Sequence, residues 1–219
     1  REKLATSGTS VSWQGHSDSE TLVESIAAWG VEKTLQASVG MFAVAVWDKK
    51  NHVLHLARDR IGEKPLYYGL SNGIFAFASE LRSLRQVGHF TLTVNRESVA
   101  AFLRLGYIPE PHSIYDNVWK VSPGTRVEIR PCDVANGKLQ APSAYWSLRE
   151  IAQCGQSNRA QFGRPEDAVD ELETLIQQSV AGQMMGDVPV GAFLSGGIDS
   201  STIVSVMQRL SLQPVKTFS

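Results

Sequence analysis

A short stretch near the end of the chain combines the residue types that hold a phosphate group. Residues 188–194 form an apolar run of strand length, and Ser195, Gly196 and Gly197 follow it directly. Adjacent glycines take backbone angles that other residues avoid, and the Asp-Ser-Ser sequence of residues 199–201 can cap a helix. A glycine turn before a helix directs unpaired N–H groups and the positive end of the helix dipole at one point. The pattern therefore predicts a nucleotide-binding loop.

The same pattern has a second interpretation, because Gly-Gly turns also precede helices at which nothing binds. The loop differs from a Walker A motif, since neither Gly-Lys-Ser nor Gly-Lys-Thr follows the glycines and the loop contains no lysine. A P-loop enzyme is therefore excluded. Two interpretations remain: a nucleotide-binding loop of another class, and a turn that binds no ligand.

Length and charge limit the classes of partner. The chain has 219 residues, enough for one or two domains, with 21 basic and 22 acidic residues. This balance gives no indication of a basic stripe for nucleic acid or a membrane surface. The longest apolar runs, 41–47 and 188–194, are too short to span a bilayer, and the N-terminus lacks the apolar stretch of a signal peptide. We expect a cytoplasmic protein with small-molecule ligands and neither nucleic-acid nor membrane partners.

The first 130 residues predict an α+β fold with antiparallel strands. Ser17 or Asp18 can cap a helix that ends near Gly30. Residues 40–48 are apolar on both alternating faces, which predicts a strand that is covered on both sides. Asn95 can cap a further helix over 96–105, which has one apolar face and which Gly106 ends. Additional strands are expected at 52–58, 66–69, 74–79 and 125–130, with a hairpin turn at 71–73.

The character of the chain changes after residue 130. Residues 131–164 are rich in Gln, Ser, Gly and Asn, which favours a linker. Pro165, followed by two acidic residues, is typical of a helix N-terminus. A helix, the strand at 188–194, the glycine loop, a helix over 201–210 and a strand from Val215 predict the start of an α/β doubly wound parallel sheet. Ligands of such sheets lie at the carboxyl ends of strands, where the glycine loop lies.

Two distant patterns resemble parts of one protein family. Residues 40–48, the A-R-D-R-I-G-E-K-P-L-Y-Y-G segment at 57–69, and residues 77–81 resemble the later half of a class II glutamine amidotransferase domain. The D-V-P-V-G-A-F-L-S-G-G-I-D-S-S segment at 187–201 resembles the pyrophosphate loop of the ATP pyrophosphatases. In this order the two patterns resemble the glutamine-hydrolysing asparagine synthetases, over nearly the whole chain.

The resemblance implies a two-site enzyme. One site hydrolyses glutamine with an N-terminal cysteine. The other uses ATP and Mg²⁺ to convert aspartate to asparagine through an acyl-adenylate, and it releases AMP and pyrophosphate. The implied organisation is the later part of an Ntn-hydrolase-like glutaminase domain with antiparallel sheets at 1–130, a linker at 131–164 and the start of the synthetase domain at 165–219. Homodimers are common in this family, so a homodimer is possible here.

The resemblance also implies roles for individual residues. The positions that match the pyrophosphate loop are Leu194, Ser195, Gly196, Gly197, Asp199 and Ser200. Asp199 would act through Mg²⁺. Asp18 matches the aspartate that binds the α-amino group of glutamine, and the alternative role for Asp18 is a helix cap. Arg58, Asp59 and Lys64 are interpreted as architectural.

Two departures from the family pattern limit the expectations. The chain does not begin with a cysteine, so no catalytic residue is assigned, and we expect a fragment that lacks both ends and is inactive alone. Gln183, Met184 and Met185 stand where many asparagine synthetases carry basic residues. The acceptor is therefore open between aspartate and another carboxylate, such as a sugar acid of a surface polysaccharide. A non-catalytic binding module is the alternative from a different class.

Overall fold

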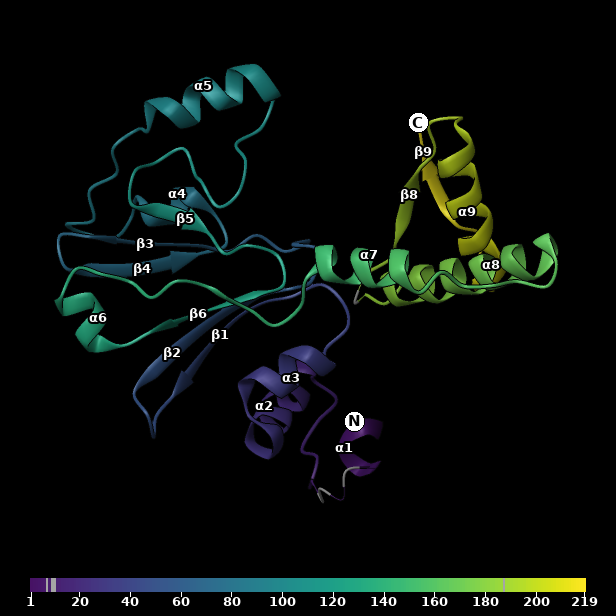
Figure 1. The fold of residues 1–219 in the computed structure, drawn as a ribbon, viewed down its shortest axis with the longest axis horizontal. Coiled ribbons are helices and arrows are strands. Elements are labelled where there is room, and N and C mark those ends of the chain that lie inside the picture. The colour runs from purple at the N-terminus through teal and green to yellow at the C-terminus, as the bar shows by residue number, and fades with distance from the viewer. Residues whose placement is uncertain (7, 9–10, 187) are drawn as a thin grey trace. The chain divides into compact units, whose positions relative to one another are not determined.

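The computed structural model describes residues 1–6, 8, 11–186 and 188–219 (Figure 1). The chain divides into two compact units, Arg1–Ala152 and Gln153–Ser219. Asp187, the first residue of the glycine-loop motif, lies outside the described residues. None of the described helices is long and apolar enough to cross a membrane.

Three helices open the first unit: α1 (Glu2–Thr6), α2 (Asp18–Trp29) and α3 (Val31–Ala37). Helix α2 begins where expected because Ser17 Oγ accepts a hydrogen bond from Ser19 N at 3.1 Å. It ends at Gly30, whose φ of 80° breaks the helix and starts α3. The predicted helix and its glycine end are confirmed.

Two antiparallel sheets follow the helices, as the turn signals predicted. The first sheet has the order β1-β2-β6-β7, and the second has the order β4-β3-β5. The strands of the first sheet are β1 (Ala43–Asp48), β2 (Val53–Arg58), β6 (Thr125–Ile129) and β7 (Ser143–Ala144). Those of the second are β3 (Tyr67–Ser71), β4 (Ile74–Ala78) and β5 (Val118–Lys120). Asn72 and Gly73, with φ of 52° and 73°, form the predicted tight turn between β3 and β4.

The main core lies between the two sheets. Leu56 of β2 and Val127 of β6 are fully buried, and they cluster with Tyr68 of β3. On the other face of the second sheet, Leu84 of α4 (Leu81–Leu84) packs against β4 and β5. On the other face of the first sheet, Leu35 of α3 packs against Ala57 of β2. These layers of helix, sheet, sheet and helix make the first unit an α+β fold, with α2 and α3 beside β1 and β2 (Figure 1).

Strand β1 is not covered on both sides, so that expectation was wrong. Ala43 packs against the main core, but Ala45 on the same face is exposed and Trp47 is 47% exposed. The reason is the place of the strand in the sheet. Within the described residues β1 is an edge strand, and β2 is its only partner in the sheet. An apolar pattern shows which residues avoid water, but it does not show where a sheet ends.

Helix α5 (Arg96–Leu105) has the predicted ends. Asn95 Oδ1 accepts a hydrogen bond from Ser98 N at 2.8 Å, and Gly106 ends the helix with a φ of 78°. Its apolar stripe is only partly covered, since Phe102 is 50% and Leu103 is 79% exposed.

The segment expected to be a linker contains regular structure. It includes α6 (Pro131–Ala135), strand β7 and α7 (Leu148–Ser157). Tyr145 is buried against α3 and β2, and its hydroxyl donates a hydrogen bond to Arg58 O at 2.7 Å. Residues 131–146 are therefore packed onto the first unit. The domain limits at residues 130 and 164, on either side of the expected linker, stay a prediction.

The second unit contains α8 (Pro165–Gln183), β8 (Gly191–Phe193), α9 (Ile198–Leu210) and β9 (Lys216–Phe218). Strands β8 and β9 pair in parallel, and α9 connects them. Val180 of α8 packs against Val206 and Met207 of α9, whereas Val169 and Leu172 are more than half exposed. The strand expected over 188–194 has only three residues, because only residues 191–193 pair with β9.

Replacing Tyr145 by Phe is expected to lower the free energy of unfolding by about 1–3 kcal/mol, because the buried carbonyl of Arg58 loses its donor. Burial, followed by the nearby charge of Asp59, raises the pKa of Tyr145 to about 12. The folded state keeps the phenolic proton that the unfolded state releases near pH 10, so wild-type stability should fall as the pH rises from 10 towards 12.

Urea denaturation of wild type and Tyr145→Phe at pH 9 and pH 11 tests both effects. The variant should show a smaller loss of stability between pH 9 and pH 11, by about 1.4 kcal/mol, because pH 11 lies one unit above the unfolded pKa. Equal losses in the two proteins would show that Tyr145 contributes nothing to the alkaline response.

Candidate functional site

The glycine loop lies between β8 and α9. Leu194 N donates a hydrogen bond to Phe218 O at 2.7 Å, which holds the end of β8 against β9. Gly196 has a φ of 79°, a left-handed conformation that side-chain-bearing residues rarely adopt. A Cβ at Gly196 would meet nothing within 4 Å, so the backbone angle, rather than space, favours glycine there.

Helix α9 begins earlier than expected. Its N-cap is Gly197, and Asp199 and Ser200 lie in the first turn rather than at the cap. The expected capping by residues 199–201 was therefore wrong. Glycine has no side chain to donate or accept, and no side-chain cap covers this helix start within the described residues. The first N–H groups of α9 are thus available to a ligand.

The two predicted serines of the loop lie together. Ser195 Oγ and Ser200 Oγ are 3.1 Å apart, and Ser200 Oγ also donates to Gly197 O at 3.2 Å. Asp199 is exposed beside them on the helix. Two hydroxyls next to a helix N-terminus suit an anion with several oxygens, because the helix dipole and the N–H groups attract the same charge.

A groove of about 660 Å³ runs between α8 and α9 on the side of Gly196 and Gly197. Its lining combines aliphatic side chains with hydroxyl groups and the ion pair between Glu173 and Arg209. Neither Ser195 nor Ser200 lines it. The groups suited to phosphate oxygens are therefore those of the loop itself.

The acidic residues provide no complete metal cage. No cluster of three or more His, Cys, Asp or Glu side chains occurs among the residues that the structure describes. Mg²⁺ in nucleotide sites usually takes one or two carboxylates and completes its shell with phosphate oxygens and water. Asp199, exposed beside the loop, fits this arrangement as a single protein carboxylate.

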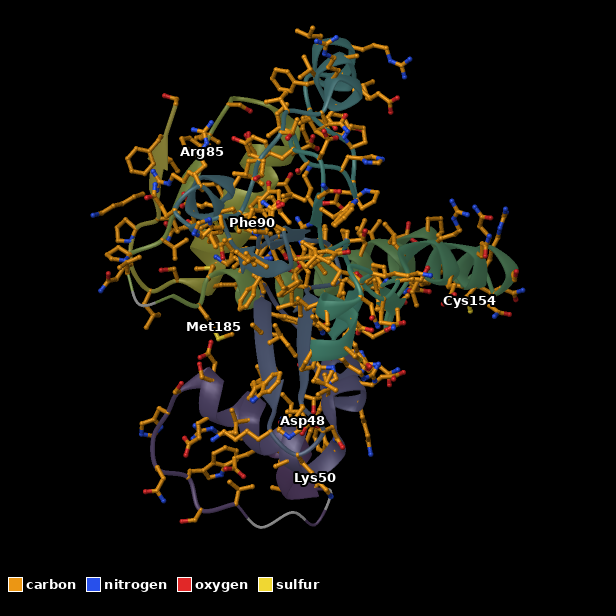
Figure 2. The ribbon with its side chains drawn as sticks, turned by 90° about the vertical axis from the view of Figure 1, so that its left-hand side faces the viewer. Asp48, Lys50, Arg85, Phe90, Cys154 and Met185 are labelled. Carbon is orange, nitrogen blue, oxygen red and sulfur yellow. The ribbon has the colours of Figure 1, made fainter. Side chains whose placement is uncertain are left out.

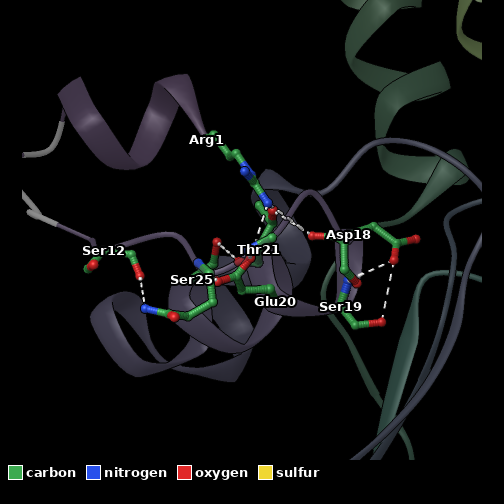
Figure 3. A network of polar contacts seen from close by, with 10 residues as sticks. Arg1, Ser12, Asp18, Ser19, Glu20, Thr21 and Ser25 are labelled. Carbon is green, nitrogen blue, oxygen red and sulfur yellow. Dashed lines mark hydrogen bonds and ion pairs between the residues drawn. The ribbon is translucent and has the colours of Figure 1, made fainter.

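Asp18 is exposed at the first position of α2 (Figure 3). Its Oδ1 atom accepts hydrogen bonds from Ser19 N at 2.7 Å and Ser19 Oγ at 3.4 Å. Because Ser17 is the N-cap, capping does not require Asp18. The carboxylate can therefore receive an ammonium group from solvent, and its role in binding glutamine stays a prediction.

Sequence reasoning missed the residue that organises the loop before α2. Glu20 accepts hydrogen bonds from Gln14 N at 2.6 Å and Gly15 N at 3.1 Å. Arg1 pairs with Glu20 at 3.3 Å and lies over the ring of Trp13, with 4.1 Å between the guanidinium carbon and the ring centre. The Ser-x-x-Glu spacing of residues 17 and 20 was a signal for this contact, since such a Glu commonly turns back towards the preceding backbone.

Asp59 organises the turn at residues 58–65 and is only 1% exposed. Oδ1 and Oδ2 together accept five backbone hydrogen bonds of 2.7–3.3 Å, from Phe42, Ile61, Gly62, Glu63 and Lys64. Burial acts to raise the pKa of Asp59, but the backbone donors outweigh it and hold the pKa below its ordinary value. The geometry supports the architectural interpretation of this residue.

Arg58 links the same turn to two other segments. It donates to Glu110 Oε1 at 2.6 Å, to Val121 O at 3.0 Å and to Lys64 O at 2.8 Å. Lys120 lies near this cluster and donates to Ile108 O at 2.6 Å, and burial lowers its pKa. The side chain of Lys64 is exposed, so its backbone, rather than its charge, serves the turn.

Comparison with known proteins gives the family. A family profile described as glutamine amidotransferase domain matches residues 1–146, which is most of the chain. The chain belongs to this family. A second profile, described as asparagine synthase, matches residues 171–219 and includes the glycine loop.

Curated relatives named glutamine-hydrolysing asparagine synthetases match most of this chain. Asparagine synthetase (glutamine-hydrolyzing) 1 of Bacillus subtilis (strain 168) is 36% identical over 220 residues, which cover 100% of this chain and 32% of the relative. Asparagine synthetase (glutamine-hydrolyzing) 3 of the same organism is 31% identical, over 93% of this chain and 31% of the relative. Amidase chry2 of Gibberella zeae is 28% identical, over 92% and 28%. The chain thus spans about a third of the length of the relatives that it matches.

Proposed function

We propose that this amidotransferase-family chain works within an ATP-dependent, glutamine-hydrolysing amide synthetase. The proposed reaction converts aspartate to asparagine through an acyl-adenylate and releases AMP and pyrophosphate. The observation that carries the proposal is the order of the two profiles, with the second one spanning a glycine loop that leaves a helix N-terminus open. We also propose the domain limits 1–130 and 165–219, with 131–164 between them.

Each loop group has a proposed part in binding the substrate ATP. Backbone N–H groups of Gly196 and Gly197, with the hydroxyls of Ser195 and Ser200, would hold phosphate oxygens. The backbone of Leu194 would lie near the nucleotide, and Asp199 would hold Mg²⁺, which screens the phosphate charge. The parallel pairing of β8 and β9 supports the start of a doubly wound sheet, with the loop at the carboxyl end of β8.

The first unit would supply ammonia. Asp18 is proposed to bind the α-amino group of glutamine, because its carboxylate is exposed and Ser17 already caps α2. ATP makes a carboxylate reactive by turning one of its oxygens into a leaving group, after which ammonia can displace that group. We propose a cytoplasmic setting, small-molecule substrates and a homodimer, without nucleic-acid or membrane partners.

A different acceptor is the second candidate. Met185 is 80% exposed, and Met184 packs against the core of the second unit, so neither offers a charge to an acidic substrate at these positions. One relative is named an amidase rather than an asparagine synthetase, so the names of the relatives do not all describe the same reaction. These observations favour testing another carboxylate, such as a surface-polysaccharide sugar acid.

The test uses the longest protein that contains this sequence, with glutamine, ATP and Mg²⁺, and measures AMP and amide product by chromatography. Aspartate should give AMP and asparagine in equal amounts. AMP with a uronate but not with aspartate would move the function to the second acceptor. If no carboxylate yields AMP, the synthetase proposal fails, and a non-catalytic binding module takes its place.

A further inference from the structure

His55 is a buried histidine that the proposed function does not use. It lies on β2, where its neighbours across the sheet are Val46 on β1 and Glu128 on β6. The residue is 8% exposed, and its Nδ1 atom has no hydrogen-bond partner in the described part of the chain. Such an atom is costly to bury, because it loses water without gaining a protein partner.

A carboxylate lies just beyond hydrogen-bond reach of that atom. Glu128 Oε1 is 3.8 Å from His55 Nδ1, too far for a hydrogen bond but close enough to attract a protonated ring. Glu128 is meanwhile bound by Arg126 at 3.2 Å and by Arg130 at 2.8 Å. The carboxylate is thus shared between two guanidinium groups, and it lies near the imidazole ring as well.

The network continues from the sheet to a helix. Arg126 also pairs with Glu32 of α3 at 3.5 Å, so the same guanidinium bridges Glu128 and α3. The charged groups that act on His55 are Asp48 at the end of β1, Glu128 and Arg126 on β6, Arg130 directly after β6, and, through Arg126, Glu32 on α3. The carboxylates favour a charged ring, and the two arginines oppose it.

We propose that His55 and Glu128 form a proton-operated latch that adjusts the attachment of α3 to the first sheet. With a neutral ring, Glu128 stays with Arg126 and Arg130, and Arg126 can link Glu128 to Glu32. A protonated ring donates from Nδ1 to Glu128 Oε1, which closes the gap between them. Glu128 then orients the Arg126 guanidinium less firmly. The ion pair between Arg126 and Glu32, which joins the sheet to α3, is weakened as a result.

The direction of the pH response follows from the site. Burial lowers the pKa of His55 below 6.5, and Glu128 only partly offsets this effect. The ring is therefore neutral at neutral pH. As the pH falls below 6.5, the unfolded chain takes up this proton before the folded one does, so acid lowers the stability that His55 contributes. Helix α3 should loosen only at the lower pH at which the folded ring itself takes up the proton.

Hydrogen exchange of the α3 amides, followed from pH 7.5 down through the pH at which the folded His55 ring titrates and corrected for the intrinsic pH dependence, tests the latch in the intact chain. In wild type, α3 exchange should rise about tenfold over this range relative to the β3–β4 hairpin. His55→Gln cannot titrate and should abolish this rise. His52→Asn, an exposed histidine of the same hairpin in a left-handed conformation that Asn tolerates, should keep it. An equal rise in His55→Gln would overturn the proposal.

NMR titration of the imidazoles gives a second measurement that does not need the His55 variant to fold. The pKa of His55 should fall further in Glu128→Gln, because the attracting carboxylate is gone. If that pKa is the same in wild type and Glu128→Gln, the two residues are not coupled and the latch does not exist. Both measurements report on the first unit alone, so their outcome is independent of the AMP assay.

Discussion

Asp59→Asn is expected to lower the free energy of unfolding by about 4 kcal/mol, because it removes a buried carboxylate that accepts five backbone N–H groups. An amide keeps one accepting oxygen and turns an NH₂ group towards N–H donors that it cannot satisfy. At least two buried donors would lose their partner, at about 1–3 kcal/mol each. The turn at residues 58–65 should lose its shape in consequence.

Asp48→Asn is the matched control for this substitution. Asp48, labelled in Figure 2, also accepts backbone hydrogen bonds in a turn, from Lys50 N at 2.9 Å and Asn51 N at 3.0 Å, but it is only partly buried. Urea denaturation at pH 7 should show a large loss for Asp59→Asn and little change for Asp48→Asn. Similar losses of unfolding free energy in the two variants would contradict the expectation that burial makes the Asp59 carboxylate more important for stability.

Acid should reduce the advantage of wild type over Asp59→Asn. The pKa of Asp59 is held below 3.8 in the folded state, so its contribution is present above pH 3.8 and is lost as the pH falls through the lowered value. Repeating the denaturation between pH 5 and pH 2 measures this convergence. A difference that stays constant over that range would contradict the role given to the charge.

Asp199→Ala is expected to reduce AMP formation at least a hundredfold in the longest protein that contains this sequence. The substitution removes the one carboxylate that the first turn of α9 offers to Mg²⁺, so the phosphate charge would be poorly screened. Glutamine hydrolysis should continue, because Asp18 and its surroundings belong to a different unit of the chain.

Asp170→Ala is the control for this experiment. Asp170 is an exposed acidic residue on α8 and is not part of the glycine loop, so its removal changes the net charge equally. Rates of AMP release and of glutamate release, measured side by side, separate the two sites. Unchanged AMP release in Asp199→Ala would refute the role of this residue, whereas loss of both activities would point to a folding defect.

Local signals predicted many of the element boundaries. Ser17 and Asn95 begin helices, and Gly30 and Gly106 end them, because a side-chain acceptor or a positive φ acts within one helical turn. The turn at residues 72–73 follows the same logic. These boundaries depend on interactions between residues that are close in the sequence. They can therefore be predicted without knowledge of the tertiary structure.

Longer-range features were missed or misjudged. Strand β2 pairs with β6 across about 70 residues, and Tyr145 reaches Arg58 over a separation of 87 residues. The position of β1 at a sheet edge exposes Trp47, although its pattern resembles that of a strand covered on both faces. Burial depends on which elements meet, and the order of residues along one strand does not contain that information.

By itself, the sequence determined the α+β class of the first unit, the glycine loop and the family resemblance that the comparisons support. Each of these depends on residue types at short spacing. Only the tertiary structure decided that Gly197 is the cap of α9, that Ser195 and Ser200 meet, and that Asp59 collects five donors. These features depend on backbone direction and on contacts between segments, because a hydrogen bond forms only where folding brings both partners to the same place.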